Sequence, residues 1–239
     1  MATAQRRAAG GQAGAADPAT AAAGQPLKAR LRGAIHHYAV FVALGVGIML
    51  VLDAQTRKAA WGCVIYTIST TAMFGASALY HRPTWQPKAR AFFRRLDHAA
   101  IFLLIAGTNT PLALIALPIE QSTRLLSIVW GGALTGIAQC MFFAHAPKAL
   151  AASLYVALGW AVLPFLQRFH AVLPNADVAL IVGGGIVYSL GALVYAAKRP
   201  DPVPHVYGYH EIFHTLVTIA ALLHFAAVYR VVNSPLGAS

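Results

Sequence analysis

The sequence predicts an all-α, polytopic membrane protein folded as a bundle of seven transmembrane helices. Three observations support this fold class. Charged residues make up 10% of the 239 positions, whereas a soluble domain carries roughly 25%. Hydrophobic residues make up 58%, and the mean hydropathy is +0.61. The apolar residues also gather in runs of about 20, the length needed to cross a hydrocarbon core about 30 Å thick.

Seven apolar runs define the expected helices, and short connections containing Pro, Gly, Asp or basic residues separate them. Two of these connections read "HRPTWQPKAR" and "KRPDPVPHVYG". We expect a membrane domain over residues 28–232 and a short tail over 233–239. The expected spans are Ala34–Leu52, Ala59–His81, Phe93–Leu117, Arg124–Ala144, Ala149–Gln167, Ala176–Ala197 and Tyr209–Arg230.

Residues 1–27 are expected to form a disordered N-terminal tail. The segment is rich in Ala, Gly, Gln and Thr and has almost no bulky apolar residue, so it cannot bury enough surface to fold. It also lacks the apolar stretch of a secretory signal peptide. The first span is therefore expected to direct membrane insertion without being cleaved.

Basic residues predict the orientation of the bundle. Thirteen of the 18 Lys and Arg residues lie in the N-terminal tail or in connections on the same side, and five lie on the other side. Because Lys and Arg concentrate in cytoplasmic loops, we expect the N-terminus inside and the C-terminus outside. This explains the net charge of +11 without a nucleic-acid partner, which would favour one basic face on a soluble module.

Three segments place polar residues inside or at the ends of spans, where such residues are costly and usually functional. Ser77 and His81 are four apart at the end of the second span and so share a helix face. Asp97 lies near the start of the third span, and His210 and His214 share a face at the start of the seventh. With seven antiparallel spans, all three segments lie at the cytoplasmic side, at one membrane depth.

Three imidazoles and a carboxylate at one depth are typical of a zinc site. Zinc in catalytic sites accepts three protein ligands and leaves a fourth position open, where a water molecule becomes reactive near neutral pH. We expect His81, His210 and His214 to be the ligands. Asp97 is expected to bind the water or orient a ligand, and Ser77 to support His81 or the water.

Each residue also has a simpler interpretation. The pair His210 and His214 can be hydrogen-bonded packing residues, and His81 can cap a helix end at the membrane interface. Asp97 can pair with Arg94 or Arg95. The agreement of three separate segments in depth favours the metal site over these alternatives.

The segment "HEIFH" also matches the HExxH motif of soluble metalloproteases. We interpret this match as coincidental, because the helix is membrane-embedded and the third ligand comes from a distant span. Glu211 points about 100° away from His210 around the helix. We expect it to pair with a basic residue of a connection.

The remaining histidines are not expected to be ligands. His36 and His37 lie at the start of the first span, and His98 adjoins Asp97 but faces another direction. His224 lies deep in the seventh span and is expected to make a hydrogen bond between helices. The others, in connections, are His145, His170 and His205.

The segments "SALYH", "RRLDHAAIFLLIAGTNTPLAL" and "HEIFHTLVTIAALLHF" resemble the three signature segments of the hemolysin III family. That family belongs with the progestin and adipoQ receptors, which include the adiponectin receptors, and the resemblance covers about residues 28–232. It implies seven helices, a cytoplasmic N-terminus and a zinc ion held by His81, His210 and His214. The family's Asp and Ser map onto Asp97 and Ser77.

The resemblance has departures and functional implications. Small polar residues expected after the Asp are Ala99 and Ala100 here, and an aromatic residue is replaced by Asn109, which affects the expected substrate cavity. In the wider superfamily such sites resemble those of lipid amide hydrolases, notably ceramidases. The family name comes from a pore-forming, cytolytic activity attributed to some bacterial members.

These observations favour a zinc-dependent membrane hydrolase of a lipid amide or ester, in which Asp97 moves a proton. Two alternatives stay open: a non-enzymatic receptor or sensor with a structural zinc, and a pore-forming cytolysin, although no span shows a polar stripe. We expect a multi-pass protein of a cell membrane, the bacterial inner membrane, with a membrane lipid as substrate or ligand.

Overall fold

The computed structural model describes residues 31–143, 148–203 and 206–238; the expected tail over residues 1–27 lies outside them. Within these ranges the regular elements are all helical, as predicted. They are α2 (Ala34–Asp53), α3 (Arg57–His81), α4 (Pro87–Ala116), α5 (Ile119–Phe142), α6 (Lys148–Gly159), the 3-10 helix η1 (Trp160–Phe165), α7 (Leu166–Val172), α8 (Asn175–Ala197) and α9 (Tyr209–Val232).

Seven helical segments of the described chain are long and apolar enough to cross a membrane, which confirms the predicted number of spans. The fifth differs in form, because it consists of α6, η1 and α7 in succession. Pro164 lies inside η1, and proline lacks the N–H that a regular helix requires. The third span begins at Pro87 rather than at Phe93, with the proline in the first helical turn, where it is well tolerated.

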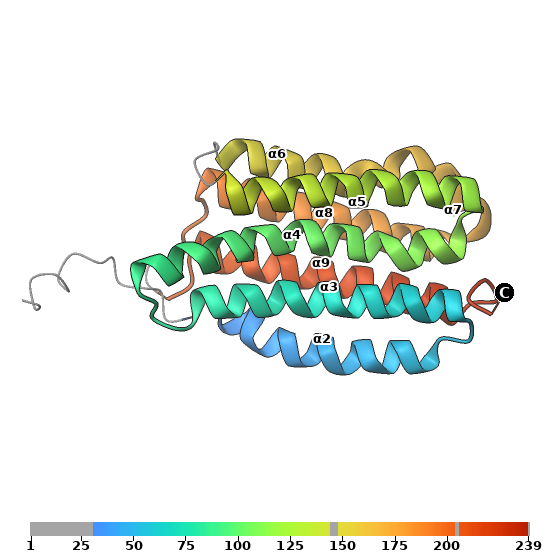
Figure 1. The fold of residues 1–239 in the computed structure, drawn as a ribbon, viewed down its shortest axis with the longest axis horizontal. Helices are drawn as coiled ribbons and strands as arrows, with labels where there is room; N and C mark the ends of the chain where they lie inside the picture. Colours follow the sequence, from blue (N-terminus) through green and yellow to red (C-terminus); the bar gives the residue numbers. More distant parts are fainter. Residues whose placement is uncertain (1–30, 144–147, 204–205, 239) are drawn as a thin grey trace, which may run out of the picture.

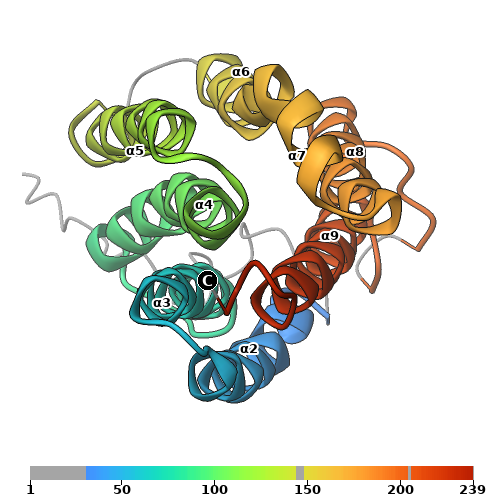
Figure 2. The same ribbon diagram turned by 90° about the vertical axis from the view of Figure 1, so that its right-hand side faces the viewer.

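Successive spans run antiparallel along the bundle (Figure 1). We call the end that holds the start of α2 and the α3–α4 and α8–α9 connections the proximal end. The opposite end, which holds the C-terminus and the α2–α3 and α4–α5 connections, is the distal end. Viewed along the bundle, the spans form a ring in which α2 lies between α3 and α9 (Figure 2).

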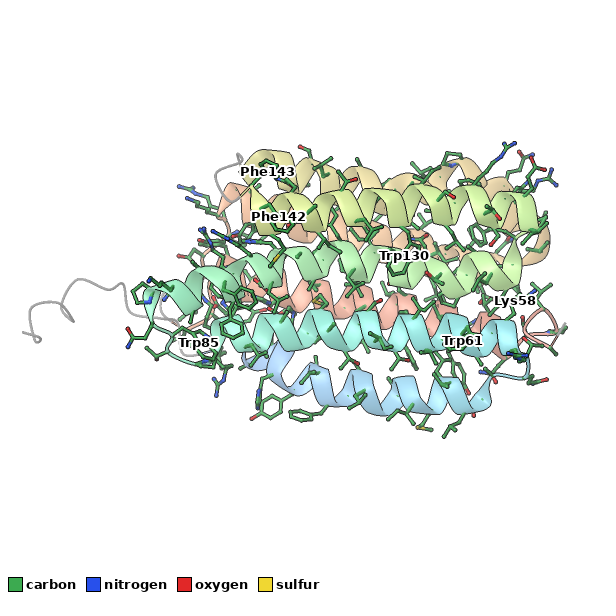
Figure 3. All side chains as sticks on the ribbon, in the orientation of Figure 1. Lys58, Trp61, Trp85, Trp130, Phe142 and Phe143 are labelled. Atoms are coloured by element: carbon green, nitrogen blue, oxygen red, sulfur yellow. The ribbon has the colours of Figure 1, made fainter. Side chains whose placement is uncertain are left out.

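Side chains follow the pattern expected for a bundle in lipid (Figure 3). Nitrogen and oxygen atoms gather near the two ends, and the middle of the outer surface is mostly carbon. Trp61 and Lys58 lie near the distal end, and Trp85 lies near the proximal end. Tryptophan is enriched where a membrane meets water, so the two tryptophans are consistent with the two interfaces of one bilayer.

A close approach of α2 to α3 at the proximal end positions the residues discussed below. Gly33, just before α2, has a left-handed backbone conformation with φ of 73°, which glycine adopts without steric cost. A Cβ atom there would lie 2.5 Å from the Cβ of His81. The start of α2 therefore packs directly against the last residue of α3.

Candidate metal centre

Three histidines from two helices meet at the proximal end. His81 is the last residue of α3, and Pro83, which lacks the N–H that a continuing helix needs, follows two residues later. His210 and His214 lie in the first two turns of α9. One side-chain nitrogen from each of the three lies within 4.8 Å of the others. The predicted convergence of His81, His210 and His214 is therefore confirmed as a group that can hold a metal ion.

The spacing and free nitrogens of this group fit a metal such as zinc. Zinc–nitrogen bonds of 2.0–2.1 Å in a tetrahedral site place two ligand nitrogens about 3.4 Å apart. The Nε2 atoms of His81 and His210 are 3.3 Å apart. The Nε2 atom of His214 is buried and has no hydrogen-bond partner, which is costly for a polar atom unless something binds there. The donor set thus suits the ion expected from the sequence.

Asp97 lies beside the histidines, as predicted. Its Oδ2 is 3.6 Å from His81 Nε2, and its side chain is 17% exposed. The alternative pairing with Arg95 is not seen, because that side chain donates to the carbonyl oxygen of Met141 at 3.2 Å. Ser77 is buried next to Asp97, but its hydroxyl makes no hydrogen bond of ordinary geometry. Both groups lie where they can act on a ligand of this site.

His36 is the one residue of this cluster that sequence reasoning missed. It is 2% exposed, and its Nδ1 lies 2.9 Å from Nδ1 of His214. Its ring also packs edge-on against Phe74, with centroids 5.0 Å apart. The sequence offers two adjacent histidines, His36 and His37, and composition does not tell which one faces the bundle. Only the rotation of α2, which is fixed by packing, decides between them.

Glu211 pairs with a basic residue, as predicted, and is bound on two sides. Its Oε1 accepts a hydrogen bond at 2.6 Å from Nε of Arg32, a residue that lies just before α2. Its Oε2 accepts from the backbone N–H of Gly208 at 2.9 Å, which satisfies one of the unpaired donors at the start of α9. With both oxygens engaged, Glu211 is a structural anchor, consistent with the interpretation that the HExxH match is coincidental.

The structure places the remaining histidines of the sequence interpretation as follows. His224 Nε2 lies 3.0 Å from the carbonyl oxygen of Ile181, which confirms the predicted hydrogen bond between helices. His98 lines the same cavity as Asp97. His170 is exposed on α7, and His145 and His205 lie outside the described residues.

A mostly apolar cavity of about 300 Å³ adjoins the three histidines and extends into the bundle. On α4 its lining includes the stretch from Asp97 to Asn109, and these twelve steps along the helix rise about 18 Å. On α9 the wall runs from His210 to His224. The side chain of Asn109 donates to the carbonyl oxygen of Ile105. The cavity therefore joins a polar end, where the histidines lie, to a long apolar interior.

Comparison with known proteins agrees with this arrangement. A family model described as "Haemolysin-III related" matches residues 25–225. The chain therefore belongs to the hemolysin III family. A hemolysin-3 homolog of Bacillus subtilis (strain 168) is 31% identical over 214 residues, which cover 87% of this chain and 97% of that protein. Hemolysin-3 of Bacillus cereus is 30% identical over 208 residues, covering 85% and 92%.

The hemolysin III family is in turn related to the adiponectin receptors. The adiponectin receptor protein of Drosophila melanogaster is 28% identical over 166 residues, which cover 59% of this chain and 37% of that protein. The family membership predicted from the three sequence segments is thus confirmed, and the chain is a multi-pass membrane protein of the hemolysin III family.

Proposed function

We propose that this protein is a zinc-dependent membrane hydrolase that cleaves an amide or ester bond of a lipid. The observation that carries the proposal is the position of the histidines and Asp97 beside a long apolar cavity. The cavity volume of about 300 Å³ lies at the lower end of the range for small-molecule sites. An acyl chain suits the apolar part, and the bond to be cleaved would then lie near the polar end.

His81, His210 and His214 would hold the ion through their ring nitrogens. Three protein ligands with an open fourth position are typical of catalytic zinc, whereas structural zinc sites have four protein ligands. When bound, zinc supplies a water that is reactive near neutral pH and a positive charge that stabilises a developing oxyanion. The residues of the chain must supply the remaining steps.

Asp97 would act as the general base and then as the general acid. Its carboxylate lies 3.6 Å from His81 Nε2, so it is close to any water bound near that nitrogen. It would accept a proton from the attacking water and return it to the leaving nitrogen or oxygen. Ser77, buried beside it, would donate a hydrogen bond to the carboxylate and hold it in position. The apolar walls would exclude other water from the reacting bond.

A second candidate is a receptor or sensor in which the metal is structural. One observation favours it: His81 belongs to α3, whereas His210 and His214 belong to α9, and these helices make few direct contacts. An ion bound by all three would tie α3 to α9. In this case removal of the metal would loosen the bundle, and no lipid would be turned over.

The test is to measure metal content and lipid turnover on the same detergent-purified protein. We expect about one zinc per chain in the wild type and loss of it in His210→Ala/His214→Ala, with His170→Ala as the control at an exposed histidine. Mass spectrometry of a lipid library should then show a product that Asp97→Asn abolishes without releasing the metal. Zinc binding with no turnover of any lipid would support the structural role instead.

The location of the site in the cell is a further part of the proposal. We propose that the proximal end faces the cytoplasm of a bacterial inner membrane. Basic residues in the described proximal connections and helix ends support this orientation: Arg32, Arg82, Lys88, Arg90, Arg94, Arg95, Lys198 and Arg199. The names of the Bacillus relatives motivate one further assay, leakage of dye from lipid vesicles, which would reveal a cytolytic activity.

A further inference from the structure

We propose that His36 is a positioning residue of the metal centre, which holds His214 in the one tautomer whose Nε2 is free to bind the ion. This inference rests on the proposed metal site and adds a residue from a third helix, α2, to it. The sequence assigns no role to His36, and no metal ligand is needed from α2 to complete the group of three histidines.

The hydrogen-bond partners of His36 determine where its proton lies. Its Nε2 is 3.3 Å from the backbone carbonyl oxygen of His214. A carbonyl oxygen can only accept, so this contact is a hydrogen bond when Nε2 of His36 carries the proton. In a neutral imidazole the other nitrogen, Nδ1, is then unprotonated and accepts.

The same reasoning fixes the proton of His214. Its Nδ1 lies 2.9 Å from Nδ1 of His36 and 3.1 Å from Nε2 of His36. We assign the shorter of these two contacts as the hydrogen bond, so that His214 Nδ1 donates to the unprotonated Nδ1 of His36. His214 Nε2 is then left with its lone pair, and this is the buried nitrogen without a partner. A metal ion requires this state of the ring, because only an unprotonated nitrogen binds it.

His36 is itself held in place on several sides. Its ring packs against Phe74 of α3 and against His214 of α9, with centroids 5.0 and 4.1 Å away. One turn earlier, Arg32 pairs with Glu211. The start of α2 thus contacts α9 at two points one helical turn apart, through Arg32 with Glu211 and through His36 with His214. This double contact fixes the rotation of α2 and keeps its histidine against the proposed ligand.

A neighbouring histidine provides a matched comparison. His37 is partly exposed, and its ring contacts Tyr38 and Phe41 of its own helix. It has the same chemistry and nearly the same position in the chain as His36, but it faces away from the cluster. Substitutions at His37 therefore control for general effects of removing an imidazole from α2.

The loss of metal affinity expected from removing His36 can be stated as a fold-change. Histidines that bind metals almost always donate their other N–H to a neighbouring acceptor, and loss of that acceptor weakens metal affinity about 10–100-fold. His36→Leu removes the acceptor and replaces the ring with an apolar side chain of similar length. His36→Asn places an amide oxygen near the position of Nδ1 and restores an acceptor. His36→Gln places its amide near the position of Nε2 and does not.

The experiment measures zinc affinity by competition with a chromogenic chelator on metal-stripped protein in detergent, together with the absorption spectrum of bound Co²⁺. We expect His36→Leu and His36→Gln to bind zinc about 10–100-fold more weakly than wild type and to change the cobalt spectrum. His36→Asn should recover most of the affinity, and His37→Leu should match the wild type. Melting temperatures of the metal-free proteins report on folding, and the Asn/Gln pair suffices if the leucine variant does not fold.

The outcomes separate this inference from the proposed function. If the wild type binds zinc and His36→Leu binds it equally well, His36 has no positioning role, but the metal site stands. If His36→Asn is as weak as His36→Gln, the residue acts through packing and the inference is wrong. If the wild type binds neither zinc nor cobalt, the proposed metal site itself fails, and this is seen before any His36 variant is compared.

Discussion

The proximal and distal ends of the bundle differ in whether their buried ionisable groups have partners. At the distal end, the buried carboxylate of Asp177 pairs with Arg230, which joins α8 to α9. At the proximal end, the Nε2 atom of His214 and the hydroxyl of Ser77 are buried without a hydrogen-bond partner. A buried polar group without a partner costs about 1–3 kcal/mol. The distal end therefore pairs its buried charge, although Gln121 Oε1 there is also buried without a partner. The proximal end leaves a histidine nitrogen beside the cavity without a partner, a cost that a bound ligand would remove.

Apolar packing is also tighter at the distal end than at the proximal end. The last two turns of α9 bury Ala227, Val228, Val231 and Val232 completely, in the larger of two hydrophobic clusters. The first two turns of α9 instead carry His210 and His214 and line the cavity. One helix thus provides both a packed end and an open end. The comparison indicates that rigid packing at the distal end supports a polar site that the chain alone does not satisfy.

The largest expected difference between the ends is which side of the membrane each one faces. Both native cysteines, Cys63 and Cys140, are buried, so single exposed cysteines can be added as reporters. Gln55→Cys marks the distal α2–α3 connection, and Thr84→Cys marks the proximal α3–α4 connection; both positions are exposed. An impermeant maleimide applied to spheroplasts should label Gln55→Cys alone. Labelling of both variants after lysis is the control, and the reverse pattern would invert the proposed orientation.

The next effect is stabilisation by metal at the proximal end. A ligand that binds only the folded state at 100 times its Kd adds about 2.7 kcal/mol to the free energy of unfolding. We therefore expect zinc to raise the melting temperature of the wild type. His210→Ala should abolish this shift, and His170→Ala should retain it. A zinc-dependent shift that survives in His210→Ala would place the ion elsewhere.

A smaller effect is expected from the ion pair at the distal end. Arg230→Ala leaves the Asp177 carboxylate buried, with 4% of its side chain exposed. The cost is reduced because the arginine is half-exposed and because Asp177 lies in the first turn of α8, where the helix dipole favours a negative charge. We expect a loss of about 1–2 kcal/mol and an unchanged zinc affinity.

The matched control for this distal pair is Arg124→Ala. Arg124 and Glu120 form an ion pair on one helix, and both side chains are well exposed. Exposed pairs of this kind contribute little, about 0.5 kcal/mol or less. If Arg124→Ala destabilises the protein as much as Arg230→Ala does, burial does not explain the distal pair. If Arg230→Ala weakens zinc binding, the two ends are coupled rather than separate.

The sequence predicted the fold and most of the site because both depend on strong physical constraints. A span needs about 20 apolar residues, and antiparallel spans bring the end of one helix next to the start of the following helix. These two rules placed His81, Asp97 and His210 at one end. Topology thus gives the common depth of the histidines, and the packing of the helices brings their side chains together.

What the sequence did not predict depends on helix rotation and on local backbone geometry. A helix that is apolar on all sides gives no sign of which face it buries, so His36 was not distinguished from His37. The break at η1 follows from Pro164, but the apolar run around it reads as continuous. The 30 residues of α4 rise about 45 Å, beyond the hydrocarbon core, so its first turns were not part of the apolar run.

The smallest expected effect concerns Glu211, which separates a structural role from a catalytic one. Glu211→Gln keeps an amide oxygen to accept from the N–H of Gly208, but it replaces the acceptor of Arg32 Nε with an NH2 group and removes the charge. The cost stays small because the side chain of Arg32 is 29% exposed and can turn toward water, and because the desolvation cost of the buried carboxylate is removed. We expect a change in unfolding free energy of less than about 1 kcal/mol and an unchanged zinc affinity.

Glu211→Ala, measured by the same thermal unfolding and zinc competition, should be clearly less stable because it removes both contacts. If Glu211→Gln binds zinc normally but abolishes a lipid turnover found in the wild type, Glu211 would be the general base of the HExxH motif. The role assigned to Asp97 would then be wrong. If turnover persists in Glu211→Gln and is lost in Asp97→Asn, the anchor at the start of α9 and the proton-transfer group are separate residues. In that case the comparison between structural and reactive polar groups holds within the proximal end as well as between the two ends.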